Sequence, residues 1–201
     1  IDADVRAIAA IEPTLEFPAR IGLARIEHAQ LSTVPADEGY IWQDVLGDLS
    51  PLYGEFVPVS PLIAASVSKY DGTPAQTIAN IRRGAARQHL DYVLVYEVGS
   101  SRVTGKANAL ALTDLTVIGM FVLPSRSIEV EASASGLLID VRTGYPYATL
   151  TAHSEKKGVS RAISEYSTTQ GLADTAAERA VEKLAVEFET VMEQLAAASL
   201  K

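Results

Sequence analysis

A long β-hairpin between Ser127 and Glu155 is the feature that most limits what this chain can fold into. Apolar and polar residues alternate from Ile128 to Ser135, which predicts a strand with one face in water. After Gly136 the apolar positions change phase, and we interpret Gly136 as a β-bulge that restores the facing. Thr143-Gly144 predicts the hairpin turn, and Tyr145–Glu155 predicts the returning strand.

Three further strands are expected before this hairpin. Ala19–Glu27 and Tyr92–Val98 carry apolar residues on both faces, which is typical of central strands covered on both sides. Glu55–Ser60 contains Pro58, which cannot donate to a ladder hydrogen bond, so we expect an edge strand. Leu62–Val67 is either a short helix or a continuation of that strand.

Helical patterns fill the intervals between the strands. Asp2–Ile11 predicts a short amphipathic helix or a loose tail, and Pro35–Leu49 predicts a helix with acidic residues in its first turn. The clearest helix starts at Thr73, which forms a capping box with Gln76. Its apolar stripe consists of Ile78, Ile81 and Ala85.

A polar stretch, Lys156–Gln170, is expected to lead into one long C-terminal helix from Gly171 to about Ser199. The apolar residues of this helix recur at heptad spacing: Ala177, Val181, Leu184, Phe188, Val191 and Leu195. The pattern favours a helix packed on its own sheet, with an intermolecular coiled coil as the alternative.

The resulting order, βαβαβββα, predicts the α/β (α+β) class. We expect a mixed sheet of about five strands with helices packed on it and a long C-terminal helix. Residues 1–17 are interpreted as an N-terminal extension or short helix, and residues 18–201 as a single domain. The 48% hydrophobic and 21% charged residues are ordinary for a globular chain of 201 residues.

Charge and cysteine content exclude several classes of function. A net charge of −8 argues against nucleic-acid binding, which needs a surplus of Lys and Arg. Without cysteine the chain has no disulfides, thiolate zinc sites or cysteine nucleophiles. No apolar run reaches the roughly 18 residues that a membrane-spanning helix needs.

The stretch from Gly99 to Lys106 imitates a phosphate-binding loop. A Walker A loop needs four residues between its glycines and a Ser or Thr after the Lys, so that a hydroxyl can hold Mg²⁺. Here five residues separate Gly99 from Gly105, and Ala107 stands where the hydroxyl residue should be. We interpret the match as a coincidence, and keep a nucleotide-binding or hydrolytic enzyme using Gly99–Lys106 as the alternative function.

No other residue set predicts chemistry. His28, His89 and His153 do not have metal-motif spacing, and surface or capping roles are expected for them. We therefore expect no catalytic residues, no metal site and no cofactor, and a protein that is not an enzyme.

The segment Leu115–Pro124 is a dense apolar run between two strands. It packs in the core as a strand or helical turn, or it forms an exposed loop that meets a partner or a membrane surface. For the second case the candidate partner-binding residues are Val117, Ile118, Met120, Phe121 and Val122. Trp42, beside Tyr40, is a weaker candidate for the same role.

The chain resembles the α/β domain shared by the curli-secretion channel lipoprotein and the amino-terminal domain of the Tol-system β-propeller protein. The resemblance is carried by "RIGLARIE", "ARQHLDYVLVYEV" and "GLLIDVRTGYPYATLTAHSE", followed by the long helix. Leu90-Asp91-Tyr92-Val93-Leu94 is similar to that family's "-ADYVLxG-" junction, and "IDVRTG" to its "-x-D-x-x-T-G-" hairpin.

This resemblance implies a bacterial envelope lipoprotein whose signal peptide and lipidated Cys precede Ile1. It implies no catalytic residues. The expected function is a non-enzymatic binding or assembly role in the periplasm, and the expected location is the outer membrane, through that anchor. The expected partners are other envelope proteins or further copies of the chain.

Overall fold

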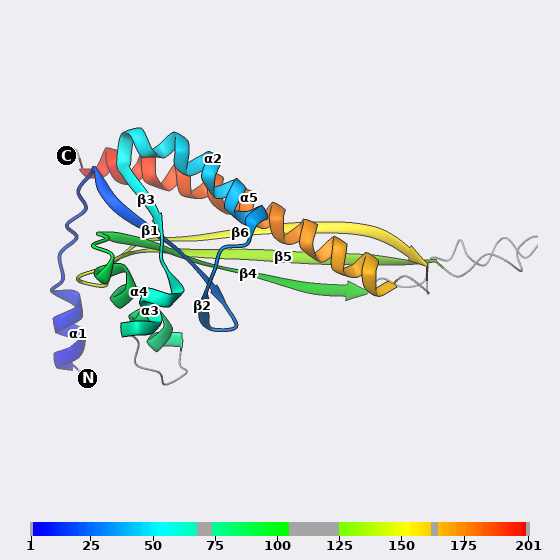
Figure 1. The fold of residues 1–201 in the computed structure, drawn as a ribbon, viewed down its shortest axis with the longest axis horizontal. Coiled ribbons are helices and arrows are strands. Elements are labelled where there is room, and N and C mark those ends of the chain that lie inside the picture. The colour runs from blue at the N-terminus through cyan, green and yellow to red at the C-terminus, as the bar shows by residue number, and fades with distance from the viewer. Residues whose placement is uncertain (1, 68–73, 105–124, 162–164, 200–201) are drawn as a thin grey trace, which may run out of the picture. The chain divides into compact units, whose positions relative to one another are not determined.

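The computed structural model describes residues 2–67, 74–104, 125–161 and 165–199 (Figure 1). Its elements, in chain order, are α1 (Asp2–Ala9), β1 (Ala19–Glu27), β2 (Gln30–Ser32), α2 (Ala36–Tyr53), β3 (Gly54–Pro58), α3 (Pro61–Val67), α4 (Pro74–Arg87), β4 (Tyr92–Thr104), β5 (Ser125–Asp140), β6 (Pro146–Arg161) and α5 (Glu165–Ser199).

The chain groups into two compact units. The first unit comprises Ile1–Glu97, Ser135–Thr151 and Leu184–Lys201, and the second comprises Val98–Ala134 and Ala152–Lys183. Strands β4, β5 and β6 and helix α5 therefore contribute to both units. The boundary expected after residue 17 stays a prediction.

The strands form one mixed sheet in the order β2-β1-β4-β5-β6, with β3 paired beside β1. Strand β1 runs parallel to β4 and to β3, and antiparallel to β2. This confirms the predicted fold class. The sheet has six strands, one more than predicted. The additional strand is β2, which follows a two-residue turn at His28-Ala29 and has too few residues to show a periodic pattern in the sequence.

The first unit has three layers (Figure 1). On one face of the sheet, α3 and α4 cover a buried core cluster that includes Val59, Ile81, Leu90, Val93 and Ile139. On the other face, α2 and the end of α5 lie side by side. Strand β1 is buried on both faces, as its sequence predicts.

Helix α5 packs within its own fold in the first unit. Phe188 is fully buried, and its ring lies 6.2 Å from that of Trp42 and 6.3 Å from that of Phe56. Leu184 is also fully buried, whereas Val191 and Leu195 are only half-buried. The expected packing on the chain's own sheet is therefore confirmed, with Met192 in the buried stripe instead of Val191.

The second unit is packed with small residues. Its fully or nearly buried side chains include Ala132 and Ala134 of β5, Ala152 of β6, and Ala176 and Ala180 of α5. Small side chains allow helix and sheet to approach closely. The expected end of the returning strand at Glu155 and start of the long helix at Gly171 are wrong, because β6 continues to Arg161 and α5 already begins at Glu165.

Two other expectations are also wrong. Val130, Ala132, Ala134 and Leu138 stay buried on one parity through Gly136, so no bulge resets the strand there. The phase change in the sequence arises because α4 and its neighbours cover the opposite face from Leu137 onward. Trp42 is only 1% exposed and belongs to the core, because α2 turns it toward the sheet.

Among the described residues, no helix combines the length and the apolar character needed to cross a membrane.

Candidate functional site

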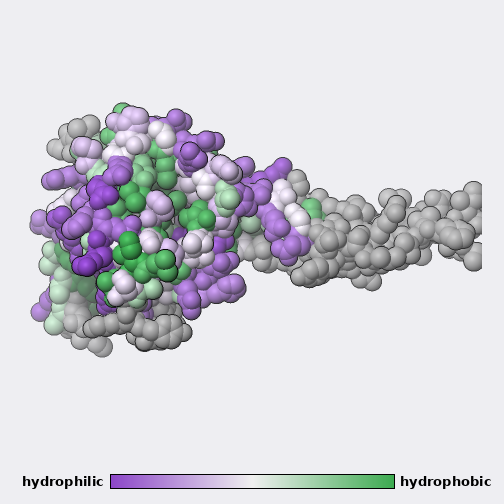
Figure 2. Space-filling view, in the orientation of Figure 1, coloured by the Kyte–Doolittle hydropathy of each residue, from purple (hydrophilic) through white to green (hydrophobic). Residues whose placement is uncertain are grey.

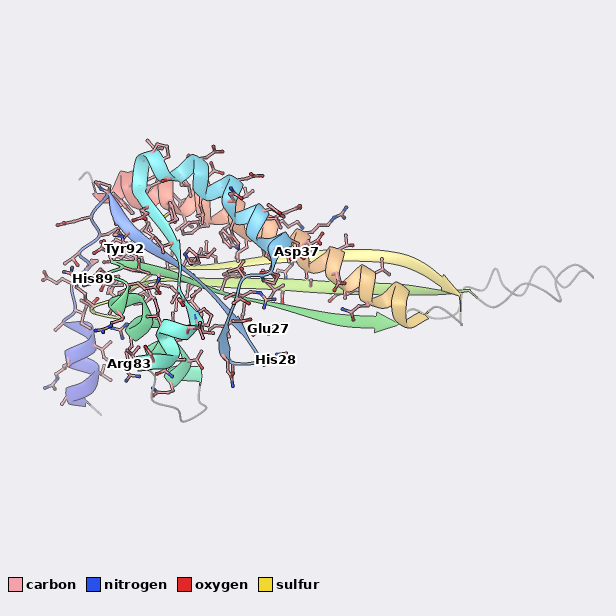
Figure 3. All side chains as sticks on the ribbon, in the orientation of Figure 1. Glu27, His28, Asp37, Arg83, His89 and Tyr92 are labelled. Carbon is pink, nitrogen blue, oxygen red and sulfur yellow. The ribbon has the colours of Figure 1, made fainter. Side chains whose placement is uncertain are left out.

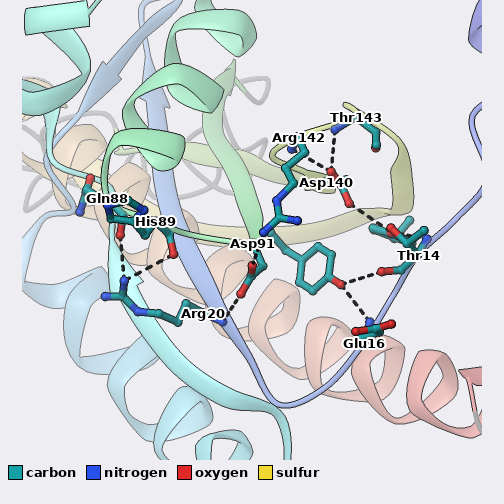
Figure 4. Close-up of polar contacts among 11 residues, drawn as sticks. Thr14, Glu16, Arg20, Gln88, His89, Asp91, Asp140, Arg142 and Thr143 are labelled. Atoms are coloured by element: carbon teal, nitrogen blue, oxygen red, sulfur yellow. Dashed lines mark hydrogen bonds and ion pairs between the residues drawn. The ribbon is translucent and has the colours of Figure 1, made fainter.

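The two motifs that carry the family resemblance meet at one polar junction in the first unit (Figure 4). Asp91 stands immediately before β4, and Asp140 is the last residue of β5. Val141 N donates a hydrogen bond to Asp91 O at 3.0 Å, so the junction before β4 is joined to the β5–β6 turn.

Asp140 closes the hairpin turn through its carboxylate. Oδ1 accepts the backbone N–H groups of Arg142 at 2.8 Å and Thr143 at 2.7 Å. Gly144 follows with φ of 79°, and its N–H donates to Asp140 O at 3.0 Å. The predicted turn at Thr143-Gly144 is confirmed, and Asp140, which is only 5% exposed, is the side chain that organises it.

Asp91 connects the same junction to β1. Its Oδ2 accepts the backbone N–H of Arg20 at 3.0 Å, and its Oδ1 lies 3.8 Å from the guanidinium of Arg142. The Arg20 side chain donates to the carbonyl of Gln88 at 2.8 Å and pairs with Glu55 at 2.8 Å. These contacts fix the loop before β4 against β1.

Two tyrosines complete the junction. The hydroxyl of Tyr92 donates to Thr14 O at 3.0 Å and accepts from Glu16 N at 2.9 Å, and the Tyr147 hydroxyl accepts from Thr14 N at 3.1 Å. Burial raises the pKa of both phenols, so they stay protonated into more alkaline solution than an exposed tyrosine does. The tyrosines therefore hold the segment before β1 against the sheet.

A polar pocket of about 410 Å³ opens beside this junction, lined in part by Asp91, Tyr92, Asp140 and Arg142. Three of its lining side chains, Asp91, Tyr92 and Asp140, accept hydrogen bonds from backbone N–H groups. The arrangement positions loops and strands, and its carboxylates act as acceptors for N–H groups. Among the described residues, no group of three or more His, Asp or Glu side chains could hold a metal ion.

A second cluster lies on the α2 side of the sheet. Arg25 of β1 donates from Nε to both carboxylate oxygens of Glu38 at 2.9 and 3.1 Å, and the Tyr96 hydroxyl donates to Glu38 Oε2 at 2.8 Å. The side chains of Arg25 and Glu38 are 10% and 8% exposed. A buried ion pair is tolerated only when such hydrogen bonds satisfy both charges.

The environment of this cluster shifts three pKa values. Burial, and then the Glu38 carboxylate, raises the pKa of Tyr96; the Trp42 indole N–H opposes this rise without reaching hydrogen-bond geometry. Burial lowers the pKa of Arg25, but the bond to and charge of Glu38 outweigh it, and the pKa is raised. The charge of Arg25 lowers the pKa of Glu27.

Sequence patterns did not reveal this cluster. Glu38 reads as a helix first-turn acid, and Arg25 as the polar position of a strand. The only available signal was Arg25 itself, a charged residue inside a strand whose neighbours are apolar on both faces. Its partner comes from α2, which the pattern of β1 cannot specify.

An apolar pocket lies on the α4 side of the sheet. It has a volume of about 410 Å³ and is lined chiefly by Ile26, Ile78, Val95 and Leu137. No residue of this pocket was singled out as a site by sequence reasoning. Pockets of this size and lining are the usual place for a ligand.

The imitation of a phosphate-binding loop is resolved in part. Residues Gly99 to Thr104 belong to β4, so this half of the stretch is a strand and does not form a loop. Gly105, Lys106 and Ala107 lie outside the described residues. The same holds for Thr73 and for the apolar segment with Val117, Ile118, Met120, Phe121 and Val122.

The three histidines are all exposed. His28 lies in the β1–β2 turn with φ of 50°, and His89 lies just after α4 with φ of 57° (Figure 3). His153 lies on β6, where its carbonyl accepts a hydrogen bond from Lys183 Nζ at 2.6 Å. The expected surface and capping positions are confirmed.

Comparison with known proteins gives no family assignment. No family model matches the chain, and no curated protein matches it. Similar solved structures include a minor lipoprotein from Acinetobacter baumannii, with 8% identity over 86% of this chain and 94% of that chain and a TM-score of 0.42.

Two other similar structures give the same picture. A lipoprotein from Neisseria meningitidis has 14% identity over 79% of this chain and 97% of that chain, with a TM-score of 0.38. The LpoB C-terminal domain from Salmonella enterica has 14% identity over 78% and 91%, with a TM-score of 0.29. Bacterial lipoproteins are thus among the similar structures, but TM-scores this low carry no argument about function.

Proposed function

We propose that this chain is a non-enzymatic domain of a bacterial cell-envelope protein, with a role in binding or assembling other envelope components in the periplasm. The observation that carries the proposal is the contact between the two resemblance motifs. The backbone of Asp91 in the "LDYVL" junction bonds to that of Val141 in the "IDVRTG" hairpin at 3.0 Å. The two motifs act as one structural unit, which supports a resemblance in fold and not only in sequence letters.

The use of the polar groups supports a non-enzymatic role. Asp140 bonds to two backbone N–H groups, and Glu38 bonds to Arg25 and Tyr96. A general acid or base must be free to exchange its proton with a substrate. Carboxylates that hold a turn and a buried arginine instead stabilise the fold.

Localisation of the native gene product tests the envelope proposal. We would express the gene with the natural sequence upstream of Ile1, label cells with an alkyne analogue of palmitate, and fractionate them. The expected result is a labelled protein in the outer-membrane fraction. Replacing the lipidated Cys upstream with Ser should abolish the labelling of the protein. An unlabelled protein in the cytosol would contradict the proposal.

The partner surface proposed for this function is the apolar segment Leu115–Pro124, which rests on the sequence alone. Replacing Ile118 and Phe121 with Ser should reduce crosslinking to envelope partners or lower the mass in light scattering. Leu62, which is 83% exposed on α3, provides the matched control as Leu62→Ser. If the double variant folds and keeps the wild-type partners and mass, this segment is not the interface.

A further inference from the structure

The apolar pocket on the α4 side of the sheet is the feature that the proposed function does not use. It lies where β1 ends beside β4, between the sheet and the first turns of α4. Ala29 of the β1–β2 turn and Thr77 of α4 contribute to its wall. In α/β proteins, a crevice at the carboxyl end of a parallel strand is a common ligand position.

The wall of the pocket is a continuation of the core. Val95 belongs to the buried core cluster, and Ile26, Ile78 and Leu137 pack against that cluster while remaining only partly buried. These side chains therefore leave apolar surface facing the pocket within the described part of the chain. Because the core supports them from behind, this surface is held in place before any ligand binds.

The polar atoms at the pocket do not compete for the ligand. Thr77 Oγ1 donates to Ala29 O, so this carbonyl at the wall is already satisfied. Among the residues that the structure describes, the lining includes no Lys, Arg or His side chain. Its charged member is Glu97, which is exposed and makes no hydrogen bond or ion pair with another described residue.

We propose that this pocket binds the uncharged apolar chain of a small molecule or lipid. Its volume of about 410 Å³ is sufficient for a small ligand, and burying apolar surface is the interaction that its lining offers. A carboxylate or phosphate at the pocket would be repelled by Glu97 and would meet no cation among the described lining residues. The ligand is therefore selected by an apolar body and against a negative head group.

Fluorescence of N-phenyl-1-naphthylamine, a neutral apolar probe, tests the pocket in the whole chain. The expected result is saturable binding that 1-dodecanol displaces, with dodecanoate about tenfold weaker. Ser135 lines the pocket from β5, and Ser135→Trp should fill it and weaken probe binding at least about tenfold. Ile78→Trp fills it from the α4 side if Ser135→Trp fails to fold, and Leu62→Ser should bind as the wild type does.

Glu97→Gln separates the proposed selectivity from a purely structural effect. Removing this charge should raise the affinity for dodecanoate toward that for dodecanol, and should leave the affinity for dodecanol unchanged. If the wild-type chain floats with phosphatidylcholine vesicles and the Ser135→Trp variant does not, the apolar chain in the pocket belongs to a membrane lipid. If dodecanol displaces the probe but the wild-type chain does not float, the ligand is a free molecule.

Wild-type probe binding in both folded tryptophan variants would overturn the site, and equal displacement by dodecanoate and dodecanol would overturn the ligand class. Neither outcome depends on where the protein resides, so this test is independent of the proposed envelope function.

Discussion

His89 ends α4 with the backbone geometry that glycine usually adopts. Leu90 N donates to Ala85 O at 3.0 Å, and His89 N donates to Ala86 O at 3.1 Å. This pair of bonds is a Schellman motif, with His89 at the left-handed position and φ of 57°. A side chain in that conformation costs free energy that glycine avoids.

We expect His89→Gly to raise the free energy of unfolding by about 0.5–1 kcal/mol, because relief of the left-handed strain outweighs the extra freedom that glycine gives the unfolded chain. Chemical denaturation measures the change. Arg87→Gly, two residues earlier at the last helical residue of α4, is the control and should lower the free energy of unfolding by up to about 1 kcal/mol. Equal destabilisation by both changes would refute this account of His89.

Tyr96 makes the fold sensitive to alkaline pH. Its pKa is raised in the folded state by burial and by Glu38, so the unfolded chain loses the phenol proton first, from about pH 10. The stability that this group contributes is fully present below pH 10 and is lost as pH rises toward the folded-state pKa.

Tyr96→Phe should lower the free energy of unfolding at neutral pH by about 1.5–3 kcal/mol, since it removes a hydrogen bond to a carboxylate. Above pH 10, the free energy of unfolding should also fall less steeply with pH in this variant than in the wild type, by up to about 1.4 kcal/mol per pH unit. Urea denaturation from pH 8 to 11 measures both. Tyr40→Phe, at a side chain 70% exposed, is the control, and an unchanged slope in Tyr96→Phe would contradict the assignment.

At the scale of elements, glycines have opposite roles in two helices. A Cβ at Gly47 of α2 would meet no atom within 4 Å, whereas a Cβ at Gly84 of α4 would lie 2.7 Å from the Cβ of Ala64 on α3. Gly47 therefore only weakens its helix, while Gly84 allows α3 and α4 to approach.

We expect Gly47→Ala to raise the free energy of unfolding by about 0.5–1 kcal/mol through helix propensity. Gly84→Ala should lower it, because the added methyl group forces the two helices apart. Thermal and urea denaturation of the two variants measure the contrast. A stabilising Gly84→Ala would show that the close approach of α3 and α4 is not required.

The β5–β6 turn depends on Asp140. Asp140→Ala removes the acceptor of two backbone N–H groups, and we expect it to lower the free energy of unfolding by about 2–3 kcal/mol. Asp140→Asn keeps the Oδ1 acceptor and should recover more than half of that loss. Hydrogen exchange at Arg142 and Thr143 provides the local measurement, and similar exchange in Ala and Asn variants would exclude this role.

At the scale of the whole molecule, the melting temperature tests the alternative function, a nucleotide-binding enzyme. Since Gly99–Thr104 is a strand, we expect ATP with Mg²⁺ to leave the melting temperature unchanged, because a ligand that binds only the folded state must raise it. A concentration-dependent rise that Lys106→Ala abolishes would restore the phosphate-binding interpretation.

The surface shows why patterns alone are a weak guide to binding. Figure 2 shows hydrophobic residues interspersed with hydrophilic ones on the face that it presents. Trp42, a weaker candidate for a partner surface, is buried, whereas Leu62 is 83% exposed although its sequence pattern does not distinguish it. Hydrophobicity predicts which residues can be buried, but the neighbouring elements decide which of them are.

The sequence by itself determined the elements whose signals are local. The α4 stripe through Ile81 and Ala85, the doubly buried β1 and the turn at Thr143-Gly144 follow from periodicity and turn chemistry over a few residues. The class of fold follows from the order of these elements.

Only the tertiary structure decided which distant residues meet. The junction of Asp91 with the Asp140 turn, the bond between Arg25 and Glu38, and the apolar pocket beside Val95 each join segments far apart in the chain. The physical reason is the same in each case. Whether a polar group can be buried, and whether an apolar group stays exposed, depends on the partners that another element supplies.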